Sequence, residues 1–406
     1  MTSPLSLARL SLTARLRRSL PGLALLALPV VAGCPPVVEE EEPTIEVAFD
    51  SDVVIVDIAA GEQHTVILSE DGAVWATGNN SDGELGHPEE FGLAESFTLT
   101  PDVGEVMDIV AGDIQTFLIY ADGTADAFGW NGDGQLGIGS DEDRQFGAAA
   151  VQTAGIEFIS GGSGHTLAID SNGDALGWGN NLSGEVGDNT NDDRTTPVFL
   201  PVLEDVLGID ASRGGASSVA NTEDGTLYTW GNNGQGQLGD AGDGTNALTP
   251  QVLDVDFAAV DVAAGQSHML ALDTDGNVWG WGTNDFGQLG TGTATQVERP
   301  VQTAGITDVV AIDAGNDWSI ALKDDGTVWV WGTGTSGQLG NDFDDNGPAL
   351  VPQQVPMLEN IVQVTAGSYH AIALDADGNV FAWGLSDMGQ LSLGIEEWRY
   401  SPVQVW

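Results

Sequence analysis

The chain has 406 residues, of which 61 are acidic and only 10 are Lys or Arg, so its formal net charge is −51. So few cations exclude a nucleic-acid-binding surface and direct binding to an anionic bilayer, because both need clustered Lys and Arg. The 41% hydrophobic content excludes a disordered chain, and the single Cys excludes a disulfide framework. The 56 glycines favour a turn-rich all-β architecture.

Residues 1–33 are predicted to be a signal peptide. Four arginines precede an apolar run from Leu20 to Ala32, which is too short to span a membrane as a helix. The run ends in Val31-Ala32-Gly33-Cys34, which resembles the lipobox of bacterial lipoproteins, where the Cys is lipidated and becomes the mature N-terminus. We therefore expect an exported lipoprotein of the outer membrane or cell surface, anchored through Cys34. The alternative is a cleavage site beside an unmodified Cys.

Residues 34–43 are predicted to be a tether, because three prolines and four consecutive glutamates disfavour packing. Beyond the signal peptide only six cations remain against all 61 acids, which leaves a net charge of −55. Such an acidic surface is most soluble where salt screens its self-repulsion, as in a saline habitat, although an ordinary solvated acidic surface is the simpler interpretation.

Residues 44–406 contain seven copies of one repeat. An Asp-Gly or Asn-Gly turn recurs every 50 to 52 residues, beginning with Asp71-Gly72. Each copy then has a second Gly six residues later and ends in a segment such as Gly134-Gln135-Leu136-Gly137. The second glycines, which we interpret as structural, are Gly78, Gly129, Gly179, Gly231, Gly282, Gly332 and Gly384.

Each copy is predicted to form four short strands. In the fifth copy these are Val260 to Ala264, His268 to Leu272, Asn277 to Trp281 and a segment that follows Pro300. About fifty residues with four strands suit one blade of a β-propeller, which leaves only short protected sheet edges.

The sequence Ala60-Gly61-Glu62-Gln63-His64-Thr65, the turn before Val74-Trp75 and the Gly-Gln-Leu-Gly ending together resemble the regulator of chromosome condensation (RCC-type) repeat. The resemblance covers residues 44–406 and implies an all-β, seven-bladed propeller. Copy two has Gln115 where His is expected, and copy four begins irregularly at Arg213-Gly214-Gly215. We therefore expect blades two and four to be the least regular.

The ring is expected to close where the two ends of the repeat region meet. By its spacing from Gly61, the segment Glu46–Phe49 corresponds to a fourth strand placed before copy one. The same segment recurs at the end of the chain as Pro402–Trp406. We predict that these N- and C-terminal strands lie in the same or adjacent blades, because an open array would leave two unpaired edges.

Four histidines, His64, His165, His268 and His370, occupy one repeat position in blades one, three, five and seven. A metal site would need several of them to converge, so one His per blade favours a structural role. Asp342, Asp344 and Asn346 match the first half of a calcium loop. Gln353 stands where that loop needs Glu, so an Asx-rich turn is favoured and no metal is assigned. No cofactor is predicted.

No catalytic constellation is recognisable, so no enzymatic activity is predicted. The resemblance implies a functionally mixed family with an exchange factor, a photoreceptor, ubiquitin-ligase modules and a β-lactamase inhibitor among its members. We predict a monomeric, lipid-anchored scaffold outside the cytoplasm that presents loops to a protein or glycan. The alternative is an enzyme, or a regulator like a guanine-nucleotide exchange factor, that uses one propeller face.

Partner recognition is expected in the loops that follow the Gly-Gln-Leu-Gly segments, because loops on a rigid scaffold usually carry recognition. These loops vary in length, and the longest is predicted to extend from Leu85 to Pro101, with Gly86–Thr100 as an exchangeable segment.

Overall fold

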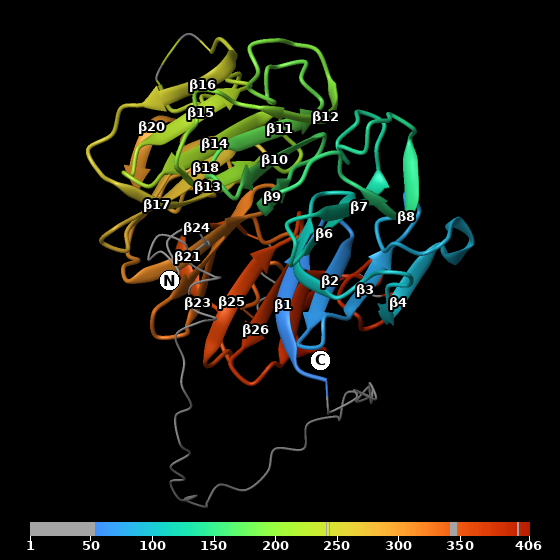
Figure 1. Cartoon of the computed structure of the whole chain (residues 1–406). Coiled ribbons are helices and arrows are strands. Elements are labelled where there is room, and N and C mark those ends of the chain that lie inside the picture. The colour runs from blue at the N-terminus through green and yellow to red at the C-terminus, as the bar shows by residue number, and fades with distance from the viewer. Residues whose placement is uncertain (1–52, 241, 243, 342–346, 396–397) are drawn as a thin grey trace, which may run out of the picture.

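A computed structural model of the protein describes residues 53–406, apart from 241, 243, 342–346 and 396–397. Within this part of the chain, seven four-stranded antiparallel sheets form the blades of a β-propeller (Figure 1). The predicted fold class is confirmed. The signal peptide, the tether with Cys34 and the segment Glu46–Phe49 lie outside the described residues, as do Asp342, Asp344 and Asn346.

The strands of each blade are consecutive in the chain. Blade one has β1 (Ile55–Ala60), β2 (His64–Ser69), β3 (Val74–Asn79) and β4 (Leu93–Leu99), and blade two has β5 (Val106–Ala111), β6 (Gln115–Tyr120), β7 (Ala125–Trp130) and β8 (Arg144–Ala150). Blade three has β9 (Ile156–Gly161), β10 (His165–Asp170), β11 (Ala175–Gly179) and β12 (Arg194–Phe199), and blade four has β13 (Val206–Ala211), β14 (Ser217–Thr222), β15 (Leu227–Gly231) and β16 (Ala247–Leu253).

Blade five has β17 (Ala259–Ala264), β18 (His268–Asp273), β19 (Val278–Gly282) and β20 (Val297–Gln302). Blade six has β21 (Val309–Ala314), β22 (Trp318–Lys323), β23 (Val328–Gly332) and β24 (Ala349–Gln354). Blade seven has β25 (Ile361–Ala366), β26 (His370–Asp375), β27 (Val380–Leu385) and β28 (Trp398–Gln404). A 3₁₀ turn, Glu89–Phe91, precedes β4, and the described residues contain no helix that is long and apolar enough to cross a membrane.

Burial falls from the second strand of a blade to its fourth. The second strand β18 is buried at all six residues, because neighbouring blades cover both of its faces, whereas the fourth strand β20 is half-buried or exposed throughout. Pro300 lies inside β20, where it costs no ladder hydrogen bond because this strand is the free edge of its sheet. The apolar core therefore lies between blades, as where Leu270 of blade five and Trp331 of blade six belong to one cluster.

The glycines six residues after the hairpin turns all have φ between 91° and 117°, a region that side chains rarely adopt. At Gly78, a Cβ would also lie 2.3 Å from the carbonyl oxygen of Gln63, which forbids any larger residue. This position therefore requires Gly in every blade.

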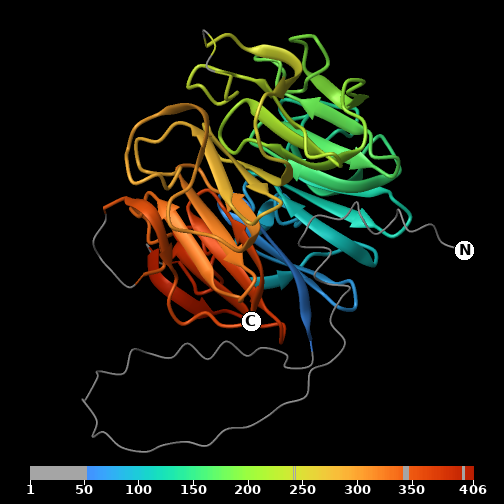
Figure 2. The same cartoon turned by 90° about the vertical axis from the view of Figure 1, so that its left-hand side faces the viewer.

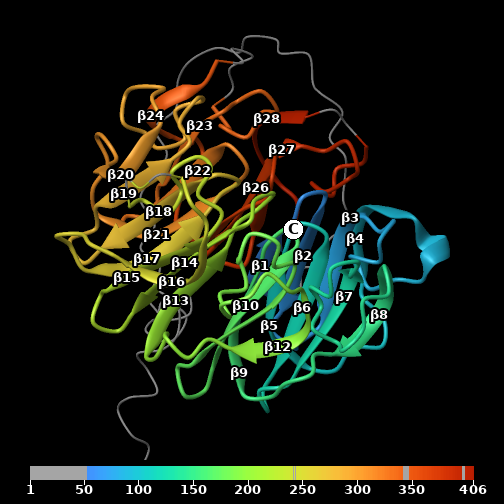
Figure 3. The ribbon, with the colours of Figure 1, turned by 90° about the horizontal axis from the view of Figure 1, so that it is seen from above.

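Successive blades follow one another in chain order around the molecule (Figure 2), so blade seven comes to lie beside blade one (Figure 3). There β1 packs against β25 and β26. At the end of the chain, the ring of Trp406 lies 5.3 Å from that of Trp75 and 5.9 Å from that of Phe97, both in blade one. The C-terminal segment thus lies beside blades seven and one, as expected, and β28 is the fourth strand of blade seven itself.

Two expectations are wrong. Gly86–Thr100 is not a loop, because it contains β4. The predicted loop ends at Pro101 because a Pro is expected to mark the fourth strand of each blade. Pro250 and Pro300 do lie inside the fourth strands of their blades, whereas Pro101 follows β4 in blade one. Blade two is also regular, since its strands pair in the same register as those of the other blades.

Candidate functional site

One face of the propeller carries two rings of loops, which we call the hub face. The hub loops connect the first and second strands of each blade, and the outer loops connect the third and fourth strands. The amide of Asn79 donates to the carbonyl of Gln63 at 2.9 Å, and the amide of Thr333 donates to that of Asp317 at 2.9 Å. Both kinds of loop therefore emerge on the same face, side by side in each blade.

The Gly-x-x-His motif builds the hub loop. A Cβ on Gly61 would lie 2.2 Å from the imidazole of His64, and one on Gly265 would lie 2.1 Å from that of His268. The ring of the His thus occupies the space that a side chain on the Gly would need. This contact explains why the two residues recur together at fixed spacing.

Each imidazole bonds to the neighbouring blade. The Nε2 atoms contact hydroxyl groups at 2.9 to 3.1 Å, in the pairs His64–Thr116, His165–Ser218, His268–Ser319 and His370–Thr65. The same hydroxyls donate to backbone carbonyls, namely those of Glu84, Glu185, Gln288 and Gln390. Because each hydroxyl has one proton, Nε2 must carry the hydrogen and donate it. Burial lowers the pKa of all four histidines to about 3, so they are neutral.

A Trp that directly precedes the second repeat Gly in five blades supports the same contact between blades. The indole Nε1 atoms donate at 2.7 to 3.0 Å to carbonyls of the preceding blade, in the pairs Trp178–Gln135, Trp230–Glu185, Trp281–Gln237, Trp331–Gln288 and Trp383–Gln338. In blade two, Gln115 replaces His and donates instead to the carbonyl of Gly162 in blade three at 3.0 Å. The histidines thus lie one at each of four joints between blades, and the described residues contain no group of three ligands that could hold a metal.

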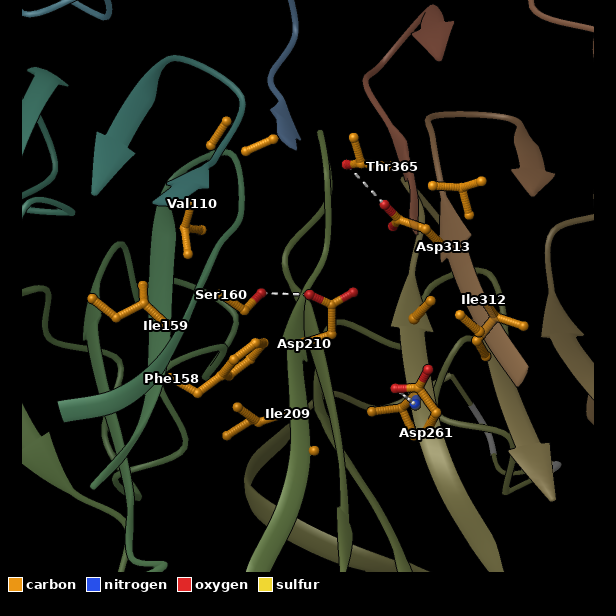
Figure 4. Close-up of a pocket in the computed structure, with 18 of the residues that line it drawn as sticks. Val110, Phe158, Ile159, Ser160, Ile209, Asp210, Asp261, Ile312, Asp313 and Thr365 are labelled. Atoms are coloured by element: carbon orange, nitrogen blue, oxygen red, sulfur yellow. Dashed lines mark hydrogen bonds between the residues drawn. The ribbon is translucent and has the colours of Figure 1, made fainter. Parts of the chain in front are cut away.

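A cavity of about 200 Å³ lies on the propeller axis, lined by the first strands of all seven blades (Figure 4). Asp210, Asp261 and Asp313 point into it from blades four, five and six. Asp210 accepts hydrogen bonds from the Ser160 hydroxyl and the Ala264 amide, which belong to the blades on either side.

These axial carboxyls hold neighbouring first strands together. Asp313 in blade six accepts from the amide of Ala366 in blade seven at 2.8 Å. Burial, with the nearby charge of Asp313, raises the pKa of Asp210 to about 6, and burial raises that of Asp261 to about 7. This set of buried acids could not be recognised from the sequence, because an acid in a strand of such an acidic chain resembles part of a solvated surface.

The hub loop of blade four reaches the axial cavity from the hub face. It is two residues longer than the others, and its Arg213 lines the cavity. The amide of Gly214 donates at 2.8 Å to the carboxylate of Asp113 in blade two, which is not an adjacent blade. Burial raises the pKa of Asp113, against the opposing charge of Arg213. The irregular start of copy four is therefore a bridge across the axis.

The rest of the hub face is acidic, and among the described residues its outer loops carry four exposed large apolar side chains, Phe91, Leu182, Phe286 and Ile395. Burial raises the pKa of Glu62, and the charges of Asp113 and Asp387 add to this effect. Leu182, in the outer loop of blade three, is 72% exposed, and Phe286, in that of blade five, is 43% exposed. Such a surface suits a partner with cationic groups and some apolar area.

Comparison with known families gives two matches. The model of the RCC1-like domain matches residues 192–406, and that of the regulator of chromosome condensation (RCC1) repeat matches residues 55–84 and 156–185. The longer match includes blades four to seven.

Several curated proteins are similar to the chain. The human E3 ubiquitin-protein ligase HERC2 is 30% identical over 341 residues, which cover 80% of this chain but 7% of the ligase. The ultraviolet-B receptor UVR8 of Arabidopsis thaliana is 29% identical over 346 residues, which cover 84% of this chain and 67% of the receptor. The secretion-regulating guanine nucleotide exchange factor of Bos taurus is 29% identical over 85% of this chain and 70% of its own.

Two solved structures share the fold. Prp20p of Saccharomyces cerevisiae, studied for its binding to Gsp1p and histones, superposes with a TM-score of 0.70 at 24% identity, over 79% of this chain and 82% of its own. Human WBSCR16 gives a TM-score of 0.73 at 23% identity, over 82% and 94% of the two chains.

Proposed function

The chain belongs to the RCC1-like domain family, and on that premise we propose that it is a lipid-anchored scaffold outside the cytoplasm whose hub face binds a protein partner. Relatives in this family act as scaffolds for protein interactions or as exchange-factor regulators. A glycan is the other partner that such loops could accept.

The observation that carries the proposal is that the hub face combines a frame of backbone bonds repeated between blades with loop tips that differ from blade to blade. The repeated part of the hub face makes the same backbone bonds in different blades, such as those from the amide of Glu62 to the carbonyl of Asp113 and from the amide of Gln266 to the carbonyl of Asn316. The tips of the loops differ from blade to blade: Leu182 and Phe286 lie in the outer loops of blades three and five, and Arg213 lies in the longer hub loop of blade four. A uniform frame with distinct tips is the arrangement expected of a recognition surface.

The location outside the cytoplasm is supported by the sequence Val31-Ala32-Gly33-Cys34 after an apolar run. The variant Cys34→Ser should accumulate as an uncleaved precursor and should not incorporate a fatty-acid probe, because the thiol that carries the lipid is gone. Normal labelling of this variant in cells would contradict lipid anchoring.

Site-specific photocrosslinking in cells that carry the full chain tests the partner surface. A photoreactive residue at Leu182 should capture a defined partner. The matched control is Met357, which is 68% exposed in the connection between β24 and β25, on the opposite face. Equal capture from both positions, or capture from Met357 alone, would refute binding on the hub face.

A further inference from the structure

One buried repeat position alternates between an amide and an acid. The second residue of the Gly-Gln-Leu-Gly segment is Gln in five blades, but it is Glu84 in blade one and Glu185 in blade three. All seven side chains accept the same bond from the amide two residues upstream, as from Asp82 to Glu84 at 2.9 Å and from Ser183 to Glu185 at 2.7 Å. The two acids therefore adopt the geometry of the amides.

The second polar atom of this side chain faces acceptors. In three of the five blades with Gln, its Nε2 donates to a side-chain oxygen on the hub face: Gln288 to Asp317 at 3.0 Å, Gln390 to Asp387 at 3.1 Å and Gln237 to Asn232 at 3.1 Å. In the other two, Nε2 of Gln135 and of Gln338 has no hydrogen-bond partner among the described residues. A carboxylate has no hydrogen to donate, whereas a protonated carboxyl has one. Glu84 and Glu185 are only 1% and 2% exposed, and Oε1 of Glu84 has no hydrogen-bond partner among the described residues.

The charges around both acids oppose ionisation. Burial raises the pKa of Glu84 to about 7, against the backbone amides that donate to its carboxyl, and the negative charge of Asp82 adds to the rise. Burial likewise raises the pKa of Glu185 to about 7, with contributions from Asp193 and Asp133. The cations nearby already have partners: Arg144 pairs with Asp82 at 2.8 Å, and Arg194 pairs with Asp188 at 2.5 Å.

The charged groups on the next hub loops complete this environment. Asp113 stands on the hub loop of blade two, beyond Glu84, and Arg213 stands on that of blade four, beyond Glu185. Asp113 bonds with Gly214, and Arg213 lines the axial cavity. Among the described residues, no Lys or Arg forms an ion pair with Glu84 or Glu185.

The same two residues also join neighbouring blades through their backbone. The carbonyl of Glu84 accepts from the Thr116 hydroxyl of blade two at 2.7 Å. The carbonyl of Glu185 accepts from the Ser218 hydroxyl and the Trp230 indole of blade four, both at 2.8 Å. Any displacement of these side chains acts directly on the joints between blades one and two and between blades three and four.

We propose that Glu84 and Glu185 are held as protonated carboxyls that take the place of Gln, and that losing these protons loosens the outer loops 80–92 and 180–193. The hub face would then respond to the pH outside the cell. This device does not require the proposed partner, because it acts on the frame of the propeller itself.

The double variant E84Q/E185Q of the full chain tests this proposal, since Gln is the residue that the other five blades use. Infrared difference spectra against the native chain at pH 6 should show the absorption of protonated carboxyl groups in the native chain only. The variant should melt at least about 2 °C higher than the native chain at pH 8 and at nearly the same temperature at pH 5. The matched control Q135E introduces a third acid in blade two and should shift melting the opposite way at pH 8.

Hydrogen exchange supplies a local measurement. Between pH 5 and 8, after correction for the intrinsic rate, exchange in loops 80–92 and 180–193 should increase in the native chain. It should stay flat in E84Q/E185Q and in the outer loop 283–296, whose blade has Gln288. Absence of the carboxyl absorption, or the same pH dependence in the native chain and the double variant, would overturn the proposal.

Discussion

The joint between blades five and six and the joint between blades seven and one, which we call the seam, use different residues for the same contact. At the first joint, the carbonyl of Gln288 accepts from the Trp331 indole at 2.7 Å and the Ser319 hydroxyl at 2.8 Å. At the seam, the corresponding carbonyl of Gln390 accepts from the Thr65 hydroxyl at 2.8 Å, and Thr77 stands where the Trp would be.

Thr77 donates instead to the carbonyl of Gly389 at 2.9 Å, so the polar part of the joint is kept while the buried indole is lost. Aromatic packing at the seam comes from the end of the chain, where Trp406 contacts Trp75 and Phe97. An internal joint is therefore stabilised by residues of the repeat itself, whereas the seam depends on residues beyond the repeat.

The largest expected effect is the loss of the C-terminal segment. Deleting residues 401–406 removes half of β28, the fully buried Val405 and Trp406 together. We expect unfolding to become easier by more than the 3–5 kcal/mol typical of one lost core aromatic, because a strand and an aromatic contact are lost at once. Chemical denaturation of the truncated chain measures this loss, and an unchanged midpoint would show that the seam does not depend on the chain end.

Removal of a single aromatic side chain should reduce stability more at the joint between blades five and six than at the seam. Trp331→Ala should cost about 3–5 kcal/mol, because this indole is fully buried and hydrogen-bonded at an internal joint. Trp406→Ala should cost less, since Trp406 is only partly buried. If Trp406→Ala were the more destabilising change in the same denaturation assay, the seam would be the more tightly packed joint.

The His position links both joints to pH. The native pKa of His268 and His370 lies at about 3, far below the ordinary value of 6.5, because burial disfavours the charged ring. The unfolded chain therefore binds more protons below pH 6.5, so stability should fall as the pH drops from 6.5 towards 3. At pH 5 each His should contribute about 2 kcal/mol to this loss.

Gln115 supplies the reference, since Gln is the residue at this position in blade two. His268→Gln and His370→Gln should each make the pH dependence of the melting temperature between 4.5 and 7 shallower, by similar amounts. A slope that is unchanged in both variants would show that these rings do not resist protonation.

The sequence predicted the parts of these joints that the repeat determines. A fixed interval of 50 to 52 residues forces every copy into one blade, so the seven blades and the one-per-blade placement of His64 and its equivalents could be foreseen. The Arg213 bridge could not be foreseen, because an insertion of two residues carries no signal that its Gly214 will reach Asp113 across the axis. The extent of the outer loop of blade one could not be predicted either, because Pro101 follows the fourth strand of that blade instead of lying within it.

The smallest expected effect compares single hydrogen bonds at the two joints. Thr77→Val removes a hydroxyl donor from the carbonyl of Gly389, which keeps the amide of Ser392 at 2.9 Å. Trp331→Phe removes the indole donor from the carbonyl of Gln288, which keeps the hydroxyl of Ser319, and the chain itself uses Phe128 at this position in blade two. Because each carbonyl retains one donor, both variants should lose about 1 kcal/mol in chemical denaturation. A much larger loss in Thr77→Val would mean that this hydroxyl, and not the packing of Trp406, closes the ring.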